Sequence, residues 1–450
     1  MDEPALTLSA LEKQMVLDRD KLQSIIDGFI VAYHHGLTND DTTMIPSYVS
    51  RLPTGAETGT YLSLDLGGTS LRVAAVTLLG DGKADIEQKS YVIPAELKVG
   101  HAEKLLDWVA LGVKELMSCL GIQVEIINEK EMYMGVTFSF PIRQTDINRG
   151  LVMKMGKGFQ LTGLEGQDIT ELLQAAFERQ GIKIHISAIV NDSVGTFVAN
   201  AYKDQNTIVS VVLSTGTNAS CICQTSSISK HNFPLDSPEY MLVNTEWGIM
   251  GMDFLPRTKY DKILDLQSIK PGFQPFEKMV SGYYLGELVR LAMVDYVKNF
   301  GLFDGVLPSG LEIPYNFTTK HMSDIGSDKS PEYNVILKIF TKDYNKSPSL
   351  DDRRTIHELV VRFSRRSAQL SAAAIASLIK LQCPDFPAVE RDIRVAVDGS
   401  LYHRFHKYSS WMNKTFREIQ RIKEDKRTKI VPVEDGGCMG AAITAMMYSH

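Results

Sequence analysis

The chain has 450 residues, of which 44% are hydrophobic and 23% are charged, and its net charge is −6. This composition excludes a disordered, collagen-like or coiled-coil chain, and the length is typical of two or three domains. The acidic balance disfavours a nucleic-acid binder, so we expect no nucleic-acid partner.

The predicted elements begin with an N-terminal helix. Apolar residues recur at helical spacing over 8–37, and Gly36 is expected to close this helix. A connection rich in proline, glycine and threonine follows over 39–58. The next predicted elements, in chain order, are strands at 61–66, 71–79 and 86–93, a helix at about 102–120 and a strand at 131–138.

The rest of the chain alternates strands with helices, which favours an α/β fold. The predicted order is a helix at 168–180, a strand at 184–190, a helix at 194–202, strands at 207–213 and 219–224, long helices at 275–300 and 354–380, strands at 393–397 and 430–433, and a helix from about 440. An apolar strand followed by a short polar turn recurs near 65, 214 and 398. This recurrence suggests two related halves that present turns to a shared cleft.

Cysteine usage and the chain's first residues bear on the compartment. The five cysteines are too sparse for a disulfide framework, and none has zinc-finger spacing. Cys221 and Cys223 alternate along a predicted strand, so we expect a buried pair on one face. The start does not resemble a signal peptide, and no apolar run approaches the roughly 18 residues that span a bilayer. We expect a cytoplasmic protein with no membrane contact.

Two turns have the composition of a phosphate site. In the turn of residues 65–69, two glycines let a ligand approach, and their amides and the Thr69 hydroxyl can donate to phosphate oxygens. Asp65 can hold Mg²⁺ directly or through water. The turn of residues 214–217 offers the same chemistry. Each alone also fits an ordinary hairpin turn, but the pair favours a nucleotide clamp. The sequence has neither a Walker A loop nor a dinucleotide fingerprint.

A second set of polar residues suits a polyol. Ser139 lies between aromatic residues just after a strand, and Glu246 precedes Trp247. Asp192 follows a predicted strand and begins a helix, so it is either an N-cap or a general base at a strand end. Glu277 opens a helix, where an acid is favourable in any case. Each has a structural explanation alone, but together they supply the short polar partners that sugar hydroxyls need.

Read together, these motifs resemble the eukaryotic hexokinases, of the actin-like ATPase (ribonuclease H-like) fold. They come in that family's order over nearly the whole chain: LDLGGTSLRV (64–73), GVTFSFPIRQT (135–145), GKGF (156–159), NDSVGT (191–196), STGTNAS (214–220), NTEWGIMG (244–251), FEKMVSGYYLGELVRL (276–291), DGSLY (398–402) and EDGGCMGAA (434–442).

The resemblance implies an ATP- and Mg²⁺-dependent kinase that phosphorylates the 6-hydroxyl of a hexose or N-acetylhexosamine. It implies catalytic roles for Asp192, as general base, and for Lys157. The sugar would be held by Ser139, Gly156, Lys157, Asn191, Asp192, Asn218, Glu246 and Glu277. The nucleotide would contact Asp65, Gly67, Gly68, Thr69, Ser70, Arg72, Thr215, Gly216, Gly399 and Ser400, with Asp65 reaching Mg²⁺ through water. A small domain (58–191 and 438–450) and a large domain (1–57 and 192–437) would enclose the sugar cleft. The oligomeric state is left open.

The sequence departs from the family pattern beside the proposed sugar site. Where most members have Trp-Thr-Lys, this chain has Met155-Gly156-Lys157. The threonine hydroxyl that would bind the sugar is therefore missing, and a site that loses such a group binds the matching sugar hydroxyl less tightly. Ser70, Leu71 and Gly437-Cys438-Met439 also differ. We favour a pocket enlarged for N-acetylglucosamine, as in the fungal hexokinase-like kinases for that sugar. Glucose phosphorylation and a sugar sensor with little catalysis are the alternatives, and a chaperone-type ATPase of the same fold would lack the sugar residues.

Overall fold

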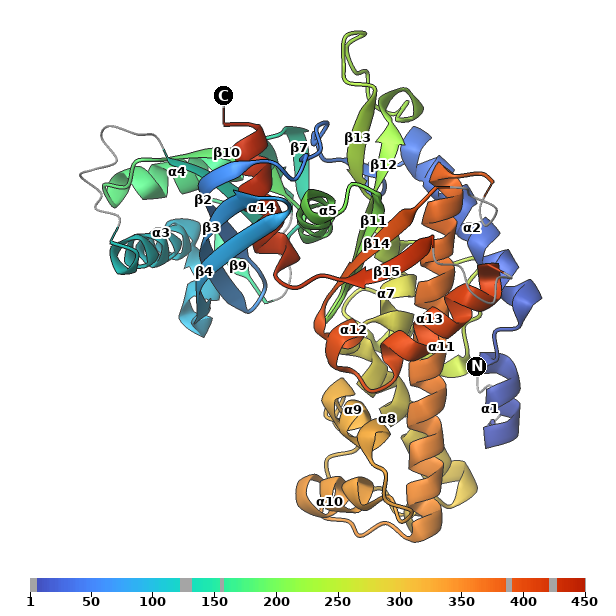
Figure 1. The fold of residues 1–450 in the computed structure, drawn as a ribbon. Helices are drawn as coiled ribbons and strands as arrows, with labels where there is room; N and C mark the ends of the chain where they lie inside the picture. Colours follow the sequence, from blue (N-terminus) through green and yellow to red (C-terminus); the bar gives the residue numbers. More distant parts are fainter. Residues whose placement is uncertain (1–5, 122–131, 154–157, 386–390, 421–426, 450) are drawn as a thin grey trace.

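Two β-sheets organise the chain, as Figure 1 shows in a computed structural model of residues 6–121, 132–153, 158–385, 391–420 and 427–449. The elements of the first half are α1 (Leu8–Met15), α2 (Arg19–Thr38), β1 (Ile45–Pro46), β2 (Thr58–Leu66), β3 (Ser70–Gly80), β4 (Lys83–Val92), β5 (Val99–His101), α3 (Ala102–Cys119), β6 (Met132–Phe138), β7 (Ile142–Asp146), β8 (Arg149–Val152), β9 (Gln160–Thr162), α4 (Ile169–Arg179), β10 (Ile184–Val190) and α5 (Asp192–Lys203).

The second half supplies most of the helices. Its elements are β11 (Thr207–Leu213), β12 (Thr217–Gln224), β13 (Tyr240–Asn244), α6 (Lys259–Gln267), α7 (Pro275–Val280), α8 (Gly282–Phe300), α9 (Thr319–Ser327), α10 (Asn334–Asp343), α11 (Leu350–Gln382), β14 (Ile393–Asp398), α12 (Ser400–Arg404), α13 (Tyr408–Gln420), β15 (Thr428–Pro432) and α14 (Gly436–Met447).

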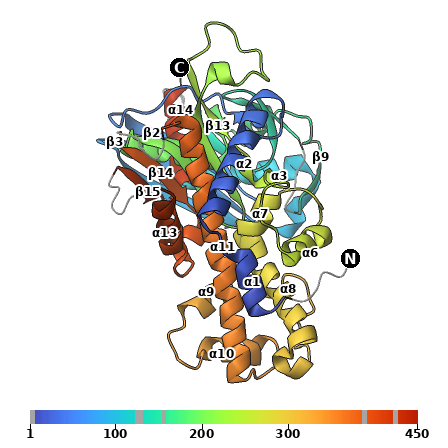
Figure 2. The same ribbon diagram turned by 90° about the vertical axis from the view of Figure 1, so that its right-hand side faces the viewer.

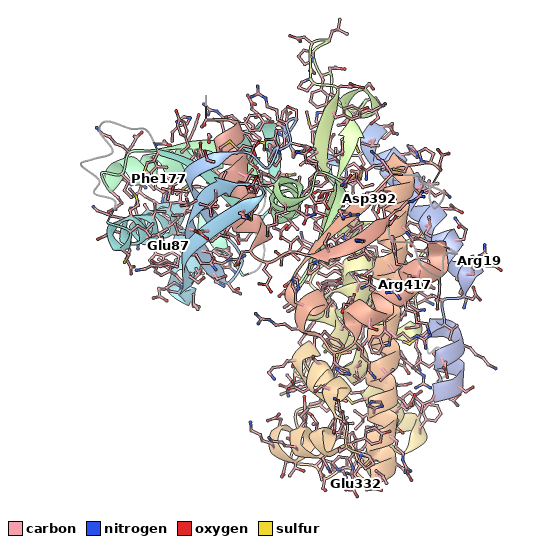
Figure 3. All side chains as sticks on the ribbon, in the orientation of Figure 1. Arg19, Glu87, Phe177, Glu332, Asp392 and Arg417 are labelled. Atoms are coloured by element: carbon pink, nitrogen blue, oxygen red, sulfur yellow. The ribbon has the colours of Figure 1, made fainter. Side chains whose placement is uncertain are left out.

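The first sheet has five strands in the order β10-β6-β2-β3-β4. Strand β2 pairs with β3 in antiparallel and with β6 in parallel, and β6 pairs in parallel with β10. Helices α3 and α4 cover one face, where Phe177 of α4 is fully buried (Figure 3). Helix α14 packs against β2, β6 and β10 on the other face. The last helix of the chain thus completes the core of its first sheet.

The second sheet has six strands in the order β1-β13-β12-β11-β14-β15. Strands β11, β14 and β15 run parallel, while β12 and β13 are antiparallel to their neighbours. Helices α2, α8, α11 and α13 contribute to the hydrophobic core beside the six-stranded sheet. Figure 2 shows α11 running past the sheet into the helical end of the molecule. In that core, the Arg366 guanidinium of α11 makes two 2.7 Å hydrogen bonds to the carboxylate of Asp261. Among the described residues, no helix is long and apolar enough to cross a membrane.

Helix α5 lies between the two halves. It packs against α14 on one side and against β11 and β12 on the other. Buried hydroxyls of Ser210 and Ser220, on β11 and β12, both donate to the carbonyl of Ser193 in its first turn. At the α5–α14 crossing, Gly440 has no room for a side chain against the backbone of Gly195. The boundaries predicted for the two domains stay a prediction.

Most predicted elements are confirmed, but two predicted helices are each divided. The segment 8–37 forms α1 and α2, because the Asp18 side chain caps a new helix at Lys21 N. Gly36 does not end α2, which continues to Thr38; instead, its missing side chain lets Thr43 and Met44 approach. The segment 275–300 is broken at Ser281, because the amides of Gly282 and Tyr283 donate to carbonyls of the 214–217 turn. Cys221 and Cys223 form the expected buried pair, with their sulfurs 3.8 Å apart.

Candidate active site

The carboxyl ends of β2, β6 and β10 meet at one edge of the five-stranded sheet. The parallel register pairs Leu66 with Phe138 and Thr137 with Val190. The turn of residues 65–69, Ser139 and the Asn191-Asp192 pair therefore follow three adjacent strands. The amide of Ser139 donates to the carbonyl of Leu66 at 3.4 Å, which joins the first two of these segments directly.

Asp192 is the first residue of α5, and Asn191 is its N-cap. The Asn191 side-chain oxygen accepts hydrogen bonds from the amide of Ser193 at 2.9 Å and from its hydroxyl at 2.8 Å. The capping role considered for Asp192 thus belongs to Asn191. Asp192 is half-buried, and its Oδ1 accepts from the same amide at 2.8 Å. The positive end of the α5 dipole favours an ionised carboxylate at this position.

A connected set of amides and one carboxylate joins Asn191 to the six-stranded sheet. We call Asn191, Asn218, Asn244 and Glu246 the amide cluster. The Asn218 Nδ2 lies 3.2 Å from Asn191 Oδ1, 2.8 Å from Asn244 Oδ1 and 3.2 Å from Glu246 Oε1. The Asn244 Nδ2 donates to Glu246 Oε1 at 2.8 Å. Three predicted sugar contacts are thus held in one hydrogen-bonded unit.

Glu246 adopts a left-handed backbone conformation, with φ 49°. Such a conformation is uncommon outside glycine and costs about 1–3 kcal/mol, so the surroundings must enforce it. The Glu246 amide donates to Asn218 Oδ1 at 3.1 Å, and the next residue, Trp247, is fully buried and donates from Nε1 to Thr217 Oγ1 at 3.1 Å. Both anchors come from β12, so that strand supports the backbone conformation of Glu246.

Glu277, in the first turn of α7, belongs to the same neighbourhood. Its Oε2 accepts from the amide of Thr217 at 2.9 Å. A Cβ atom at Gly216 would lie 2.8 Å from that oxygen, so a side chain there would displace the end of the Glu277 side chain. The Glu277 carboxylate therefore lies beside a glycine that the sequence predicts to contact the nucleotide, and that contact stays a prediction.

The turn of residues 214–217 adjoins the loop after β14. The Ser214 hydroxyl lies 3.3 Å from that of Ser400. Gly399 has φ 113° and no room for a side chain against the carbonyl of Leu213, so the two strand ends approach closely. The Asp398 carboxylate accepts from the amides of Gly399 at 2.6 Å and Gly436 at 3.1 Å. Thr215, Gly216, Gly399 and Ser400 thus come from two adjacent turns.

The turn of residues 65–69 is accompanied by a group of charges, which we call the ion-pair group: Asp65, Arg72 and Asp435. The Arg72 guanidinium contacts Asp65 Oδ2 at 2.5 Å and Asp435 Oδ1 at 3.0 Å. Burial alone lowers the pKa of Arg72, but the neighbouring carboxylates outweigh it and raise that pKa, so Arg72 is a permanent cation. Burial, reinforced by Asp65, raises the pKa of the adjacent Cys438 thiol to about 12 and keeps it neutral.

Backbone contacts hold the turn itself. The Gly67 amide donates to the carbonyl of Ser70 at 3.0 Å, within its own turn. The Lys98 ammonium donates to the carbonyl of Gly68 at 2.8 Å, and the Ile93 amide donates to that of Thr69 at 2.9 Å. The turn is thereby fixed from three sides.

The residues present fit a magnesium ion that arrives with a nucleotide. Asp65 is a buried carboxylate, only 8% exposed, at the end of a strand beside a permanent cation. Within the described ranges, no group of three or more His, Cys, Asp or Glu residues could hold a metal by itself. Mg²⁺ usually keeps several waters and binds one or two carboxylates together with substrate phosphates. A site in which Asp65 is the protein carboxylate agrees with this pattern.

Gly156 and Lys157 lie outside the described residues. The following residue, Gly158, has φ 86°, and the Phe159 ring packs edge-on against Phe140 at 5.2 Å. Phe140 directly follows Ser139, so Phe159 packs against the Ser139 segment.

Sequence reasoning missed three side chains that hold these groups: Asn244, Asp398 and Asp435. Asn244 and Asp398 are the last residues of β13 and β14, and Asp435 precedes the first residue of α14. Each stood inside a quoted motif. A polar residue at the end of an apolar strand was the signal that could have found the first two.

Comparison with known proteins gives a consistent result. The hexokinase family models match residues 7–202 and 208–447. The hexokinase-2 of Oryza sativa subsp. japonica is 33% identical over 452 residues, covering 98% of this chain and 91% of that protein. The hexokinase-1 of Schizosaccharomyces pombe is 33% identical over 447 residues, covering 98% and 90%. A solved hexokinase from Schistosoma mansoni, complexed with glucose, is 31% identical, covers 98% of both chains and has a TM-score of 0.85.

Proposed function

Because this chain belongs to the hexokinase family of sugar-phosphorylating enzymes, we propose that it transfers the γ-phosphoryl group of ATP to the 6-hydroxyl of glucose or a close hexose relative. The observation that carries the sugar assignment is the amide cluster. Its carboxylate and amides, with Glu277 nearby, provide the directional donors and acceptors that a neutral polyol requires.

In the proposed reaction, Asp192 is the general base. Its carboxylate accepts the proton of the sugar 6-hydroxyl while that oxygen forms a bond to the γ-phosphorus and the bond to the bridging oxygen of ADP breaks. The ionised state that this role needs is favoured by the N-terminus of α5. Ser139, Lys157, Asn191, Asn218, Glu246 and Glu277 would orient the sugar, so that its 6-hydroxyl is directed to Asp192.

ATP would lie along the turns of residues 65–70 and 214–216, with Gly399 and Ser400 on the adenosine side. Arg72 would supply positive charge toward the phosphates, which spread negative charge during transfer. Asp65 would hold Mg²⁺ through water, and the ion would then supply further charge neutralisation on the phosphates. Closure of the two halves over the sugar would exclude water as a competing acceptor.

Glucose is our first choice of substrate because the relatives named above are hexokinases, and one of them is described with glucose bound. The preference for N-acetylglucosamine that the sequence suggested is not supported by these comparisons. It rests on Gly156, which lies outside the described residues, and it stays as the alternative.

A coupled assay of ADP release with glucose, mannose, fructose and N-acetylglucosamine tests both proposals. We expect the highest kcat/KM with glucose. A higher kcat/KM with N-acetylglucosamine would overturn the glucose assignment and favour the enlarged pocket. Sugar binding by calorimetry without any ADP release would indicate a sensor instead of a kinase.

A further inference from the structure

We propose that Asn244 is a positioning residue of the sugar site, one that sets the orientation of Asn218 and Glu246 without itself touching the sugar. This inference rests on the proposed function, because those two residues are proposed to hold sugar hydroxyls. It adds a requirement of its own: the pair must be connected through the amide of Asn244.

The side chain of Asn244 is held at the end of a strand inside the six-stranded sheet. Asn244 is the last residue of β13, and its backbone pairs with Ser220 of β12 and Ile45 of β1. Only 8% of the residue is exposed. With a strand on either side, its backbone has little freedom to move, and so its amide group is a fixed reference for its neighbours.

Both ends of that amide are used. Its Oδ1 accepts from Asn218 Nδ2 and its Nδ2 donates to Glu246 Oε1, each at 2.8 Å. These are the shortest of the hydrogen bonds between side chains of the amide cluster; the other two between side chains are 3.2 Å long. The amide of Asn244 thus bridges an amide donor and a carboxylate acceptor, which no purely donating or purely accepting side chain could do.

This bridge favours the direction in which Asn218 faces, together with the acceptors Asn191 Oδ1 and Glu246 Oε1. Because Asn244 Oδ1 takes the Nδ2 end of Asn218, the Oδ1 end is turned toward the backbone, where it accepts from the amides of Ala219 at 2.8 Å and Glu246 at 3.1 Å. A flipped Asn218 would place two oxygens against each other and lose both backbone donors. The same bridge holds the carboxylate of Glu246, whose left-handed backbone needs outside support.

Exchanging the donor and acceptor roles gives a direct test. In the Asn244→Asp variant, a carboxylate would replace the donor to Glu246 Oε1, and two like charges would meet. Adding Glu246→Gln restores the hydrogen bond, because the new amide at position 246 can donate to the new carboxylate at position 244. We expect N244D to raise the KM for the sugar about 10-fold or more with a KM for ATP within about 2-fold, and the double variant to be no worse than E246Q alone within about 2-fold. If the sugar KM of the double variant instead rose by the product of the two single-variant increases, the substitutions would act independently and the proposal would be overturned.

Asn200→Leu is the matched control. Asn200 is another buried asparagine, 5% exposed, and it is not one of the proposed sugar contacts. Its Nδ2 donates to Thr207 Oγ1, and these two atoms are 2.7 Å apart. Its loss is expected to lower stability and leave the sugar KM unchanged. An equal rise in the sugar KM for N200L and N244D would show that Asn244 acts only through general stability. If N244D does not fold, recovery of folding and of sugar binding in the double variant supports the bridge, and failure of both contradicts it.

The outcomes separate this inference from the proposed function. Wild-type protein that phosphorylates no sugar would remove the proposed function. E246Q with unchanged sugar affinity would remove Glu246 from the sugar site. A sugar KM that responds to E246Q but not to N244D would leave the kinase assignment intact and remove only the positioning role.

Discussion

The amide cluster and the ion-pair group both gather polar side chains around the ends of strands, but different kinds of interaction hold them together. The amide cluster joins three amides and one carboxylate through directional hydrogen bonds. The ion-pair group holds one cation between two carboxylates. Neutral hydroxyls are selected by direction, whereas phosphates are selected by charge. The comparison indicates that sugar affinity and ATP affinity should respond separately to mutation and to salt.

Loss of Asp192 is the most severe test of the sugar side. We expect Asp192→Ala to lower kcat by about 10³-fold, because a positioned general base contributes about 10²–10⁴ to the rate. Sugar binding should change much less, since the amide cluster keeps its own bonds. ADP release measures the rate and calorimetry measures the binding. A variant that still turns over near the wild-type rate would remove Asp192 from the role of base.

Removal of the Arg72 charge is the corresponding test of the phosphate side. We expect Arg72→Gln to raise the KM for ATP about 10–100-fold, because a charge-assisted contact to phosphate is lost, with little effect on sugar affinity. The KM for ATP should also rise less steeply with salt than in the wild type. Arg149→Gln, at a more exposed ion pair with Glu171, is the control. Equal weakening of sugar and ATP binding would contradict the separation of the two sides.

A smaller effect is expected at Trp247, the buried residue that follows Glu246 in the chain. Trp247→Phe removes the hydrogen bond from Nε1 to Thr217 Oγ1 and leaves a void in a fully buried position. The expected loss is about 1–3 kcal/mol of unfolding free energy, measured by urea denaturation, with a modest rise in the sugar KM. If the KM for ATP rose and the sugar KM did not, Trp247 would belong functionally to the other side.

The smallest effect concerns pH. Burial raises the pKa of the Asp398 carboxyl above its ordinary value, so the folded protein binds this proton more readily than the unfolded chain does. That contribution to stability is present at low pH and is lost as pH rises through the raised pKa. Relative to Asp398→Asn, the wild type should therefore gain stability as pH falls from 7 toward the ordinary carboxyl pKa of about 3.9. Urea unfolding at several pH values checks the sign, and the opposite trend would contradict it.

Local sequence patterns were sufficient for most strands and for the turns that follow them. Alternating apolar residues and glycines are local signals, so Asp65, Ser139, Asp192 and Ser214 were correctly expected at strand ends. Features that depend on distant contacts were not predictable in this way. The break at Ser281 exists because amides there donate to a turn about 70 residues earlier, as the Gly282–Ser214 bond shows.

The site shows the same limit at the level of single side chains. Glu246 and Asn218 can be predicted by their residue types, but the bridge that Asn244 adds to their direct contacts comes from a neighbouring strand. The sequence predicts a close approach at Gly216, but only the fold shows that the Glu277 carboxylate lies beside it. Spacing along the chain carries no information about which of several polar groups will face each other.

The return of α14 to the first sheet has a consequence for synthesis on the ribosome. Strands β2, β6 and β10 are complete by Val190, but the helix that covers their second face begins at Gly436. At about 5–20 residues per second, that apolar face waits on the order of ten seconds or more for its cover. During this interval the apolar face of the nascent sheet lacks its α14 cover. The five-stranded sheet should therefore become resistant to protease only after the last turns of α14 have left the exit tunnel.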